Sequence, residues 1–256
     1  MSLVAVFEAA GTAASTTTSL LLAASMPVGQ PVICAECDPS GGDLAAWAEL
    51  RQTPGWATAV AAGDRSWNGL RTHLQQMPSG LSVLAAPSQT RVARTVVREA
   101  VGRFGALLGS MPDVLTVADC GRLGAEPPAW LEPASLLLML VRQAPTSTGA
   151  TVARVDRAAE AMDRLRPMNS RIGVVVIGAR PYEPQQVIDV VGGELLGVLP
   201  EDPVGAGLAA GAWTVGRGAS RSALARATRP LAATLAERLA GVGSVVPFEQ
   251  RSGTAG

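Results

Sequence analysis

The chain has 256 residues, of which 48% are hydrophobic, so it can bury a sizeable core and nothing in its composition favours disorder. Its formal net charge at pH 7 is zero, because 21 basic residues balance 21 acidic ones. This balance argues against the broad positive surface of a nucleic-acid-binding protein and leaves room only for a local arginine patch.

All 21 basic residues are arginine, and the sequence contains no lysine. The nucleotide composition of the source genome is the simplest explanation. The chemical consequence is that no lysine ammonium group is available to bind a phosphate.

Three cysteines, Cys34, Cys37 and Cys120, form an odd and sparse set that is typical of a reduced compartment. Cys34 and Cys37 have C-x-x-C spacing, but a strand would point them to opposite faces, and His73 is the only histidine. We therefore expect buried thiols and no metal or redox site. The longest apolar runs, such as residues 136–141, are too short to span a bilayer, and no basic segment precedes an apolar one at the N-terminus, so we expect a cytoplasmic protein.

Short apolar runs rich in Val, Ile and Leu predict strands covered on both faces, at residues 3–7, 31–35, 81–85, 114–118, 136–141, 172–177 and 195–199. Longer segments with helical spacing lie between several of them, at residues 16–25, 91–108, 150–165 and 220–239. This alternation predicts an α/β fold with a mostly parallel, doubly wound sheet of about seven strands and helices on both faces.

The stretch 43–79 is less regular and carries Trp47, Trp56 and Trp67. We expect short helices over the sheet edge there. The aromatic side chains either cover that edge or form an interface with a partner. We expect one domain over residues 1–245 and a frayed C-terminal tail over residues 246–256.

The first strand leads into "EAAGTAASTTT", a loop of small residues that opens an apolar helix. This loop resembles the deviant Walker A loop of the ParA/MinD family, written KGGxGKTT. The resemblance places Ala10 at the signature lysine, Gly11, Thr12 and Ala14 at the three glycines, Ser15 at the phosphate-binding lysine and Thr16 at the Mg²⁺-binding hydroxyl.

Other segments resemble this family in the same order along the chain. "VICAECDPSGGDLAAW" matches the second strand and its acidic positions, here Glu36 and Asp38, and "DVLTVADCGRL" matches the strand ending in the Walker B aspartate, here Asp119. "GLSVLAAP" resembles the strand that the MinD and CpaE branches place before a long helix, and "LLGVLPEDP" resembles the late strand and loop beside the adenine. The resemblance covers residues 1–245 and implies the ParA/MinD-like P-loop fold.

The resemblance also implies a site for ATP with Mg²⁺. It assigns Thr16, Asp38 and Asp119 to the metal and Asp38 to the attacking water. It assigns nucleotide contacts to Gly11, Thr12, Ala13, Ala14, Ser15, Thr16, Thr17, Gly178, Pro200, Glu201 and Asp202, with Arg122, Arg180 or Arg217 as substitute cations.

Structural alternatives exist for the metal positions and the arginines. Thr16 can cap a helix, Asp38 can form an Asx turn with Ser40, and Asp119 can accept backbone N–H bonds. The arginines can be solvated surface residues.

Several departures from the family pattern weaken the predicted site. The loss of a lysine removes a charge-assisted hydrogen bond worth roughly 1.5–3 kcal/mol, which lowers phosphate affinity on the order of ten- to a hundred-fold. Glu8 adds a negative charge at the loop, and Gly178 stands where the family has an adenine-reading asparagine. We therefore expect ATP to bind weakly or not at all, and hydrolysis to suffer more than binding.

Among ParA/MinD-like proteins, the chain is most similar to the TadZ/CpaE group, which positions the assembly machinery of Flp/Tad-type pili. This implies a localisation or assembly factor for pilus or secretion machinery, recruited by protein partners to the pole or inner membrane face and dimeric without nucleotide. The alternative is an active ATPase of the chromosome-partitioning or division-site type that uses Asp38 and a substitute arginine.

Overall fold

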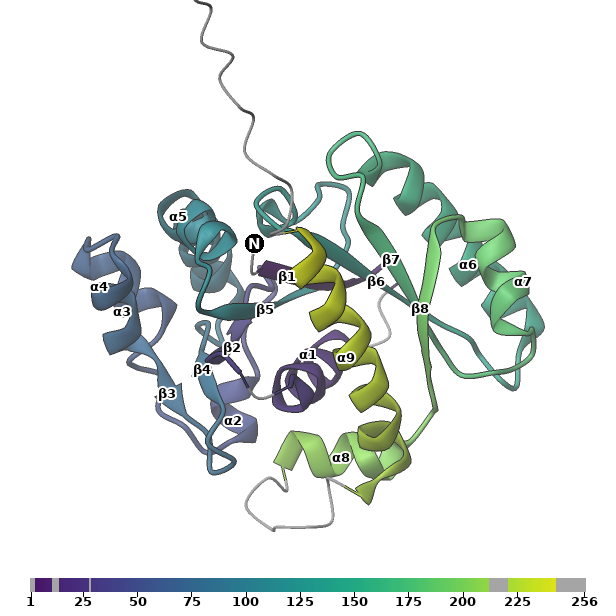
Figure 1. The fold of residues 1–256 in the computed structure, drawn as a ribbon, viewed down its shortest axis with the longest axis horizontal. Helices are drawn as coiled ribbons and strands as arrows, with labels where there is room; N and C mark the ends of the chain where they lie inside the picture. The colour runs from purple at the N-terminus through teal and green to yellow at the C-terminus, as the bar shows by residue number, and fades with distance from the viewer. Residues whose placement is uncertain (1–2, 11–13, 28, 212–220, 243–256) are drawn as a thin grey trace, which may run out of the picture.

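A computed structural model describes residues 3–10, 14–27, 29–211 and 221–242. Five predicted features lie outside these ranges: Gly11, Thr12 and Ala13 of the loop, Arg217, and the tail 246–256. Figure 1 shows the described elements arranged around one twisted sheet with helices on both of its faces.

The sheet has eight strands in the order β3-β4-β2-β5-β1-β6-β7-β8, and every neighbouring pair is parallel except β3 with β4. The strands are β1 (Leu3–Glu8), β2 (Val32–Glu36), β3 (Gln75–Gln76), β4 (Ser82–Leu84), β5 (Leu115–Arg122), β6 (Leu136–Arg142), β7 (Ile172–Ile177) and β8 (Glu194–Leu199). The seven expected strands are confirmed, and the expected count was one short because the two-residue strand β3 is too brief and too polar to produce an apolar run.

The helices are α1 (Ser15–Ser25), α2 (Leu44–Trp47), α3 (Trp56–Ala62), α4 (Trp67–Leu70), α5 (Thr90–Ser110), α6 (Thr148–Leu165), α7 (Pro184–Val191), α8 (Pro203–Gly211) and α9 (Ala223–Val242), with short 3₁₀ turns η1 (Arg71–His73) and η2 (Ala129–Leu131). The four expected helices correspond to α1, α5, α6 and α9. Their described ends lie within three residues of the expected ones.

Strand β1 shows why the pattern of the sequence produces this architecture. All six of its residues are buried, and alternate side chains enter opposite core layers: Leu3, Ala5 and Phe7 pack with one layer, and Val4 and Val6 with the other. Helices α3, α5, α6 and α7 contribute to the first layer, and α1, α2, α8 and α9 to the second (Figure 1). A strand covered on both faces therefore shows an unbroken apolar run.

The irregular segment forms short helices beside one edge of the sheet, as predicted. Trp56 is fully buried in the core, whereas Trp47 and Trp67 are half-buried. Cys34 and Cys37 enter opposite core layers, and both are free and buried, like Cys120. Among the described helices, none is both long and apolar enough to cross a membrane.

Candidate functional site

Three acidic residues lie at or near the carboxyl ends of three neighbouring central strands. Glu8 is the last residue of β1, Glu36 is the last residue of β2, and Asp119 lies on β5 between them, directly opposite Glu36 in the register. Because the carboxyl ends of parallel strands share one edge of the sheet, these three carboxylates gather where an α/β protein usually binds its ligand.

The side chain of Glu8 turns toward the start of α1. Its side chain is only 2% exposed, and its carboxylate accepts hydrogen bonds from the backbone N–H of Ser15, at 2.7 Å, and from that of Ala14. Ala14, the N-cap residue of α1, supplies no side-chain cap. Glu8 therefore satisfies the first N–H groups of α1, and its negative charge faces the positive end of the helix dipole.

Thr16 does not cap the helix, because α1 begins one residue earlier, at Ser15. The side-chain hydroxyls of Thr16 and Ser15 instead form hydrogen bonds with the carboxylate of Asp119, and the backbone N–H of Gly121 donates to Asp119 Oδ1 at 3.2 Å. Burial of the carboxyl group raises the pKa of Asp119 to about 6 despite these bonds. Asp119 therefore links the first turn of α1 to the end of β5.

Asp38 forms the Asx turn that its sequence context allows, since Asp38 Oδ1 accepts the backbone N–H of Ser40 at 2.6 Å. Its carboxylate packs against Gly121, whose φ of +65° and lack of space for a Cβ both require glycine. Partial burial is the main cause that raises the pKa of Asp38, and the charges of Asp43 and Glu8 add to it.

Glu36 is a structural acid. Its Oε1 accepts the backbone N–H groups of Asp43 and Leu44, each at 2.6 Å, and its Oε2 accepts that of Ala86 at 2.9 Å. Burial raises the pKa of Glu36 to about 7, and the charge of Asp119 contributes to this rise. Glu36 thus ties the start of α2 and the segment after β4 to the end of β2.

The predicted base side of the site is small. A cavity of about 110 Å³ lies there, whereas ligand pockets usually measure about 300–1,000 Å³. Its lining includes Ala14, Thr17, Thr18, Arg142, Ile177, Pro200, Glu201, Asp202, Pro203, Ala206 and Leu224. An ion pair of 2.8 Å between Arg142 Nε and Glu201 Oε1 joins two lining residues.

Asp202 is engaged by backbone groups of two segments. Its Oδ1 accepts the N–H of Gly205 at 2.8 Å in α8, and its Oδ2 accepts that of Leu224 at 3.1 Å in α9. These backbone hydrogen bonds, led by that of Gly205, lower the pKa of Asp202. Asp202 therefore joins the starts of α8 and α9.

Gln143 is a residue of this region that sequence reasoning missed. It is fully buried, its Nε2 donates to the carbonyl oxygens of Gly178 and Tyr182 at 2.8 and 2.9 Å, and its Oε1 accepts the N–H of Tyr182 at 2.9 Å. Gly178, at φ +84°, begins the loop that Gln143 holds. The sequence offered one indication of this role: Gln143 is an amide residue that comes directly after Arg142, at the end of the apolar run of β6.

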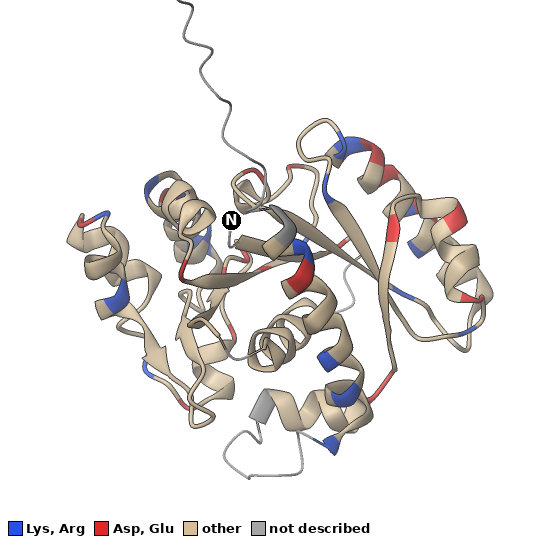
Figure 2. Ribbon diagram, viewed as in Figure 1, with Lys and Arg blue, Asp and Glu red and all other residues tan. Residues whose placement is uncertain are grey.

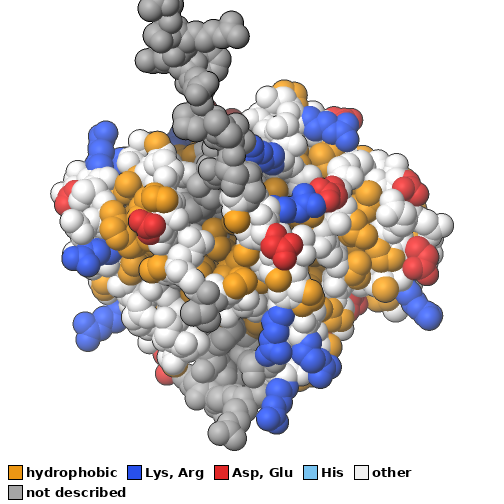
Figure 3. Space-filling view, viewed as in Figure 1, with side chains coloured by type: hydrophobic (Ala, Val, Ile, Leu, Met, Phe, Trp, Pro, Cys, Tyr) orange, Lys and Arg blue, Asp and Glu red, His pale blue; other side chains and the backbone are white. Residues whose placement is uncertain are grey.

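The two candidate cations among the described residues, Arg122 and Arg180, are exposed. Arg122 is the register partner of Glu8 on β5, and Arg180 follows the end of β7; neither takes part in an ion pair within the described residues. The chain does carry a local group of exposed arginines: Arg221 just before α9, and Arg226 and Arg229 in its first half. Figure 2 marks basic residues along this part of the ribbon, and Figure 3 shows basic side chains gathered on the same side of the molecule.

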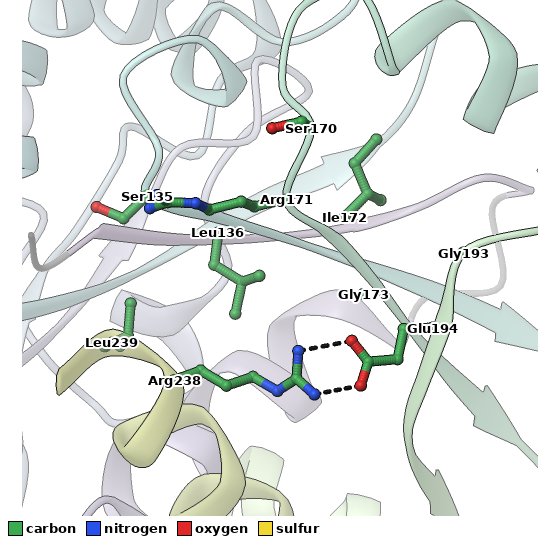
Figure 4. A pocket seen from close by; sticks show the side chains of 10 residues that line it. All are labelled: Ser135, Leu136, Ser170, Arg171, Ile172, Gly173, Gly193, Glu194, Arg238 and Leu239. Carbon is green, nitrogen blue, oxygen red and sulfur yellow. Dashed lines mark hydrogen bonds and ion pairs between the residues drawn. The ribbon is translucent and has the colours of Figure 1, made fainter. Parts of the chain in front are cut away.

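A different cavity, of about 450 Å³, lies at the amino ends of β6, β7 and β8, away from the carboxylate edge. Figure 4 shows Arg238 of α9 reaching Glu194 at the start of β8 through two contacts, one of them 2.6 Å long. The other lining residues are Ser135, Leu136, Ser170, Arg171, Ile172, Gly173, Gly193 and Leu239. This ion pair joins α9 to the edge strand and does not belong to the predicted site.

The residues at the carboxylate edge do not fit a magnesium nucleotide. Glu8 occupies the N–H groups of Ala14 and Ser15, at the helix start where an anion would bind, and the described cavity on the base side has a volume of only about 110 Å³. Within the described ranges, no group of three or more His, Cys, Asp or Glu residues is arranged to hold a metal ion.

No family profile and no curated protein sequence matches the chain. Solved structures do match. The chain is similar to a ParA family ATPase from Chlorobium tepidum TLS, with a TM-score of 0.70 and 17% identity over 91% of this chain and 98% of that one. It is also similar to the septum site-determining protein MinD of Pyrococcus horikoshii OT3, complexed with Mg-ADP, with a TM-score of 0.71 and 16% identity over 96% and 99% of the two chains.

A third similar structure is from a MinC:MinD cell division protein complex of Aquifex aeolicus, with a TM-score of 0.64 and 16% identity over 98% of this chain and 99% of that one. Sequence identities of 16–17% establish a shared fold and do not establish a shared activity. By its sheet, its layers and these neighbours, the chain has the α/β fold of the ParA/MinD-type P-loop ATPases.

Proposed function

We propose that this ParA/MinD-like protein acts as a localisation or assembly factor for Flp/Tad-type pilus or secretion machinery, and that it binds and hydrolyses ATP weakly or not at all. It belongs, in this proposal, to the divergent TadZ/CpaE-like members with a degenerate Walker A loop. Its surfaces then serve protein partners in the cytoplasm, which recruit it to the pole or to the inner membrane face.

The charge of the site is the observation that carries the proposal. The carboxylates of Glu8, Glu36, Asp38 and Asp119 lie near one another at this edge of the sheet. Burial is the largest cause of the raised pKa values of Asp38, Asp119 and Glu36, and a neighbouring carboxylate adds to each: Glu8 to that of Asp38, Asp38 to that of Asp119, and Asp119 to that of Glu36. A triphosphate would add further negative charge. The sequence supplies no lysine to neutralise it.

The structural neighbours support a role in partner binding. One of them is a MinD protein in complex with MinC, so this fold can serve as a platform for another protein. In this chain we propose a homodimer that forms without nucleotide, because the signature lysine that would cross between subunits is absent. The half-buried Trp47 and Trp67 are candidates for contacts with partners.

One observation favours the alternative, an active ATPase of the partitioning or division-site type. Thr16 and Asp119, the two residues that would share a magnesium ion, are already in hydrogen-bond contact. In that case Asp38 would order the attacking water, and an arginine such as Arg122 would replace the lysine.

Calorimetric titration with ATP and Mg²⁺, together with an ATPase assay, separates the two functions. We expect no micromolar binding, and the same background phosphate release from the wild type, Thr16→Ala and Asp38→Ala. Micromolar binding, or turnover that both substitutions abolish, would contradict the proposal. Flanking genes for a secretion ATPase and pilins would support the pilus assignment, whereas a flanking centromere-binding protein would support the alternative.

A further inference from the structure

The contact between Glu8 and the start of α1 joins two adjacent parts of the fold. Glu8 ends the central strand β1, and α1 begins seven residues later at Ser15. The carboxylate turns toward the helix and accepts the N–H groups of Ala14 and Ser15. These backbone groups occupy the positions of the third glycine and the lysine in the loop that the sequence resembles.

The Glu8 carboxylate is buried, unlike the side chain of an ordinary helix cap at the protein surface. A carboxylate that is 2% exposed needs partners for its charge, because an isolated buried charge is very costly. The N–H groups and the dipole at the head of a helix supply such partners for an anion. The 11-residue helix α1 has no acidic residue in its own first turn, so Glu8 provides the anion from the neighbouring strand.

We propose that Glu8 is a built-in anion, an autoinhibitory contact that holds the place at the head of α1 where a phosphoryl group would otherwise bind. The inference rests on the proposed loss of nucleotide binding and names the residue that enforces it. Two anions cannot share the same two donors at hydrogen-bond distance. Glu8 therefore excludes a phosphoryl group and also supplies the stabilisation that a bound nucleotide would give to α1.

A second consequence concerns the neighbouring contact at Asp119. By fixing the backbone of Ser15, Glu8 also positions the Ser15 and Thr16 hydroxyls beside the Asp119 carboxylate. Glu8 and Asp119 together then join β1, α1 and β5.

The test removes the side chain and offers inorganic pyrophosphate as the probe. Glu8→Ala should unfold at a lower temperature than the wild type, and pyrophosphate should raise its midpoint. Calorimetry should show pyrophosphate affinity at least about tenfold above that of the wild type, because one competing charge has gone. Glu183→Ala is the matched control: Glu183 accepts a backbone N–H at the start of α7, so this variant should lose stability without gaining pyrophosphate binding.

Equal pyrophosphate affinity in Glu8→Ala and the wild type would overturn the inference, as would an equal gain in Glu183→Ala. If Glu8→Ala does not fold, Glu8→Gln keeps the acceptor oxygen and removes the charge, and hydrogen exchange at the Ser15 amide should be faster in it than in the wild type. Unchanged exchange would also overturn the inference. Micromolar ATP binding by the wild type is a different result, which contradicts the proposed function itself.

Discussion

The indole Nε1 of Trp56 donates a 2.8 Å hydrogen bond to the backbone carbonyl oxygen of Glu36. The same ring packs at centroid distances of 5.8 Å from Phe104 and 5.2 Å from Trp130. Trp56 therefore connects α3 to the end of β2, directly beside the carboxylate cluster. Of the three tryptophans in this segment, it is the one committed to the core.

Trp56→Ala should reduce the free energy of unfolding by about 3–5 kcal/mol, since it leaves a large cavity and an unpaired Glu36 carbonyl oxygen. Trp67→Ala, at a half-buried position, should cost clearly less. Urea denaturation of both variants measures the difference. Equal losses would show that the aromatic cluster does not hold this edge of the sheet.

Gln143→Leu should destabilise the protein by on the order of 2–4 kcal/mol, because it leaves buried backbone groups of Gly178 and Tyr182 without partners. Gln185→Leu is the control, since Gln185 is exposed and makes a single side-chain bond to Asp189. It should change stability by under about 0.5 kcal/mol. Chemical denaturation measures both variants, and similar values for them would refute a locking role for Gln143.

The protein should become less stable as the pH rises from 5 to 8. Burial raises the pKa of Glu36 from 4.5 to about 7 and that of Asp119 from 3.8 to about 6. Between roughly pH 4 and pH 7 the folded chain therefore binds more protons at these groups than the unfolded chain, and the free energy of unfolding falls as the pH rises.

Thermal unfolding at pH 5 and pH 8 measures this effect, with each kcal/mol worth about 2–4 °C at this chain length. Asp119→Asn should reduce the difference between the two midpoints, because it removes one of the two titrating groups. A midpoint that increases from pH 5 to pH 8 would contradict the burial of charged carboxyl groups at this site.

The nucleotide-free protein should be a dimer in light scattering, with the same mass after addition of ATP and Mg²⁺. The reason is that its interface cannot use a lysine that reaches across to a nucleotide in the other subunit. A strict monomer at high protein concentration, or a dimer that forms only with ATP, would count against this prediction.

Most strands could be predicted from the sequence because a strand that is buried on both faces consists of an unbroken run of apolar residues, as in β1 and β7. Strand β3 could not be predicted in this way, because its residues Gln75 and Gln76 are polar and join the sheet through backbone pairing with β4. The Asx turn at Asp38 could be predicted because its partner, Ser40, is only two residues away in the sequence. The hydrogen bonds between Gln143 and Tyr182 could not be predicted from the sequence, because the two residues are 39 positions apart.

The sequence by itself determined the alternation of strands and helices, the order of the matching segments and the absence of any lysine. These properties are local or compositional, so they need no knowledge of distant contacts. Only the tertiary structure decided that Glu8 lies within hydrogen-bond distance of Ser15 and that four carboxylates share one edge of the sheet. The orientation of a side chain at the end of a strand depends on the neighbouring strands and the next helix, and these are placed only when the chain folds.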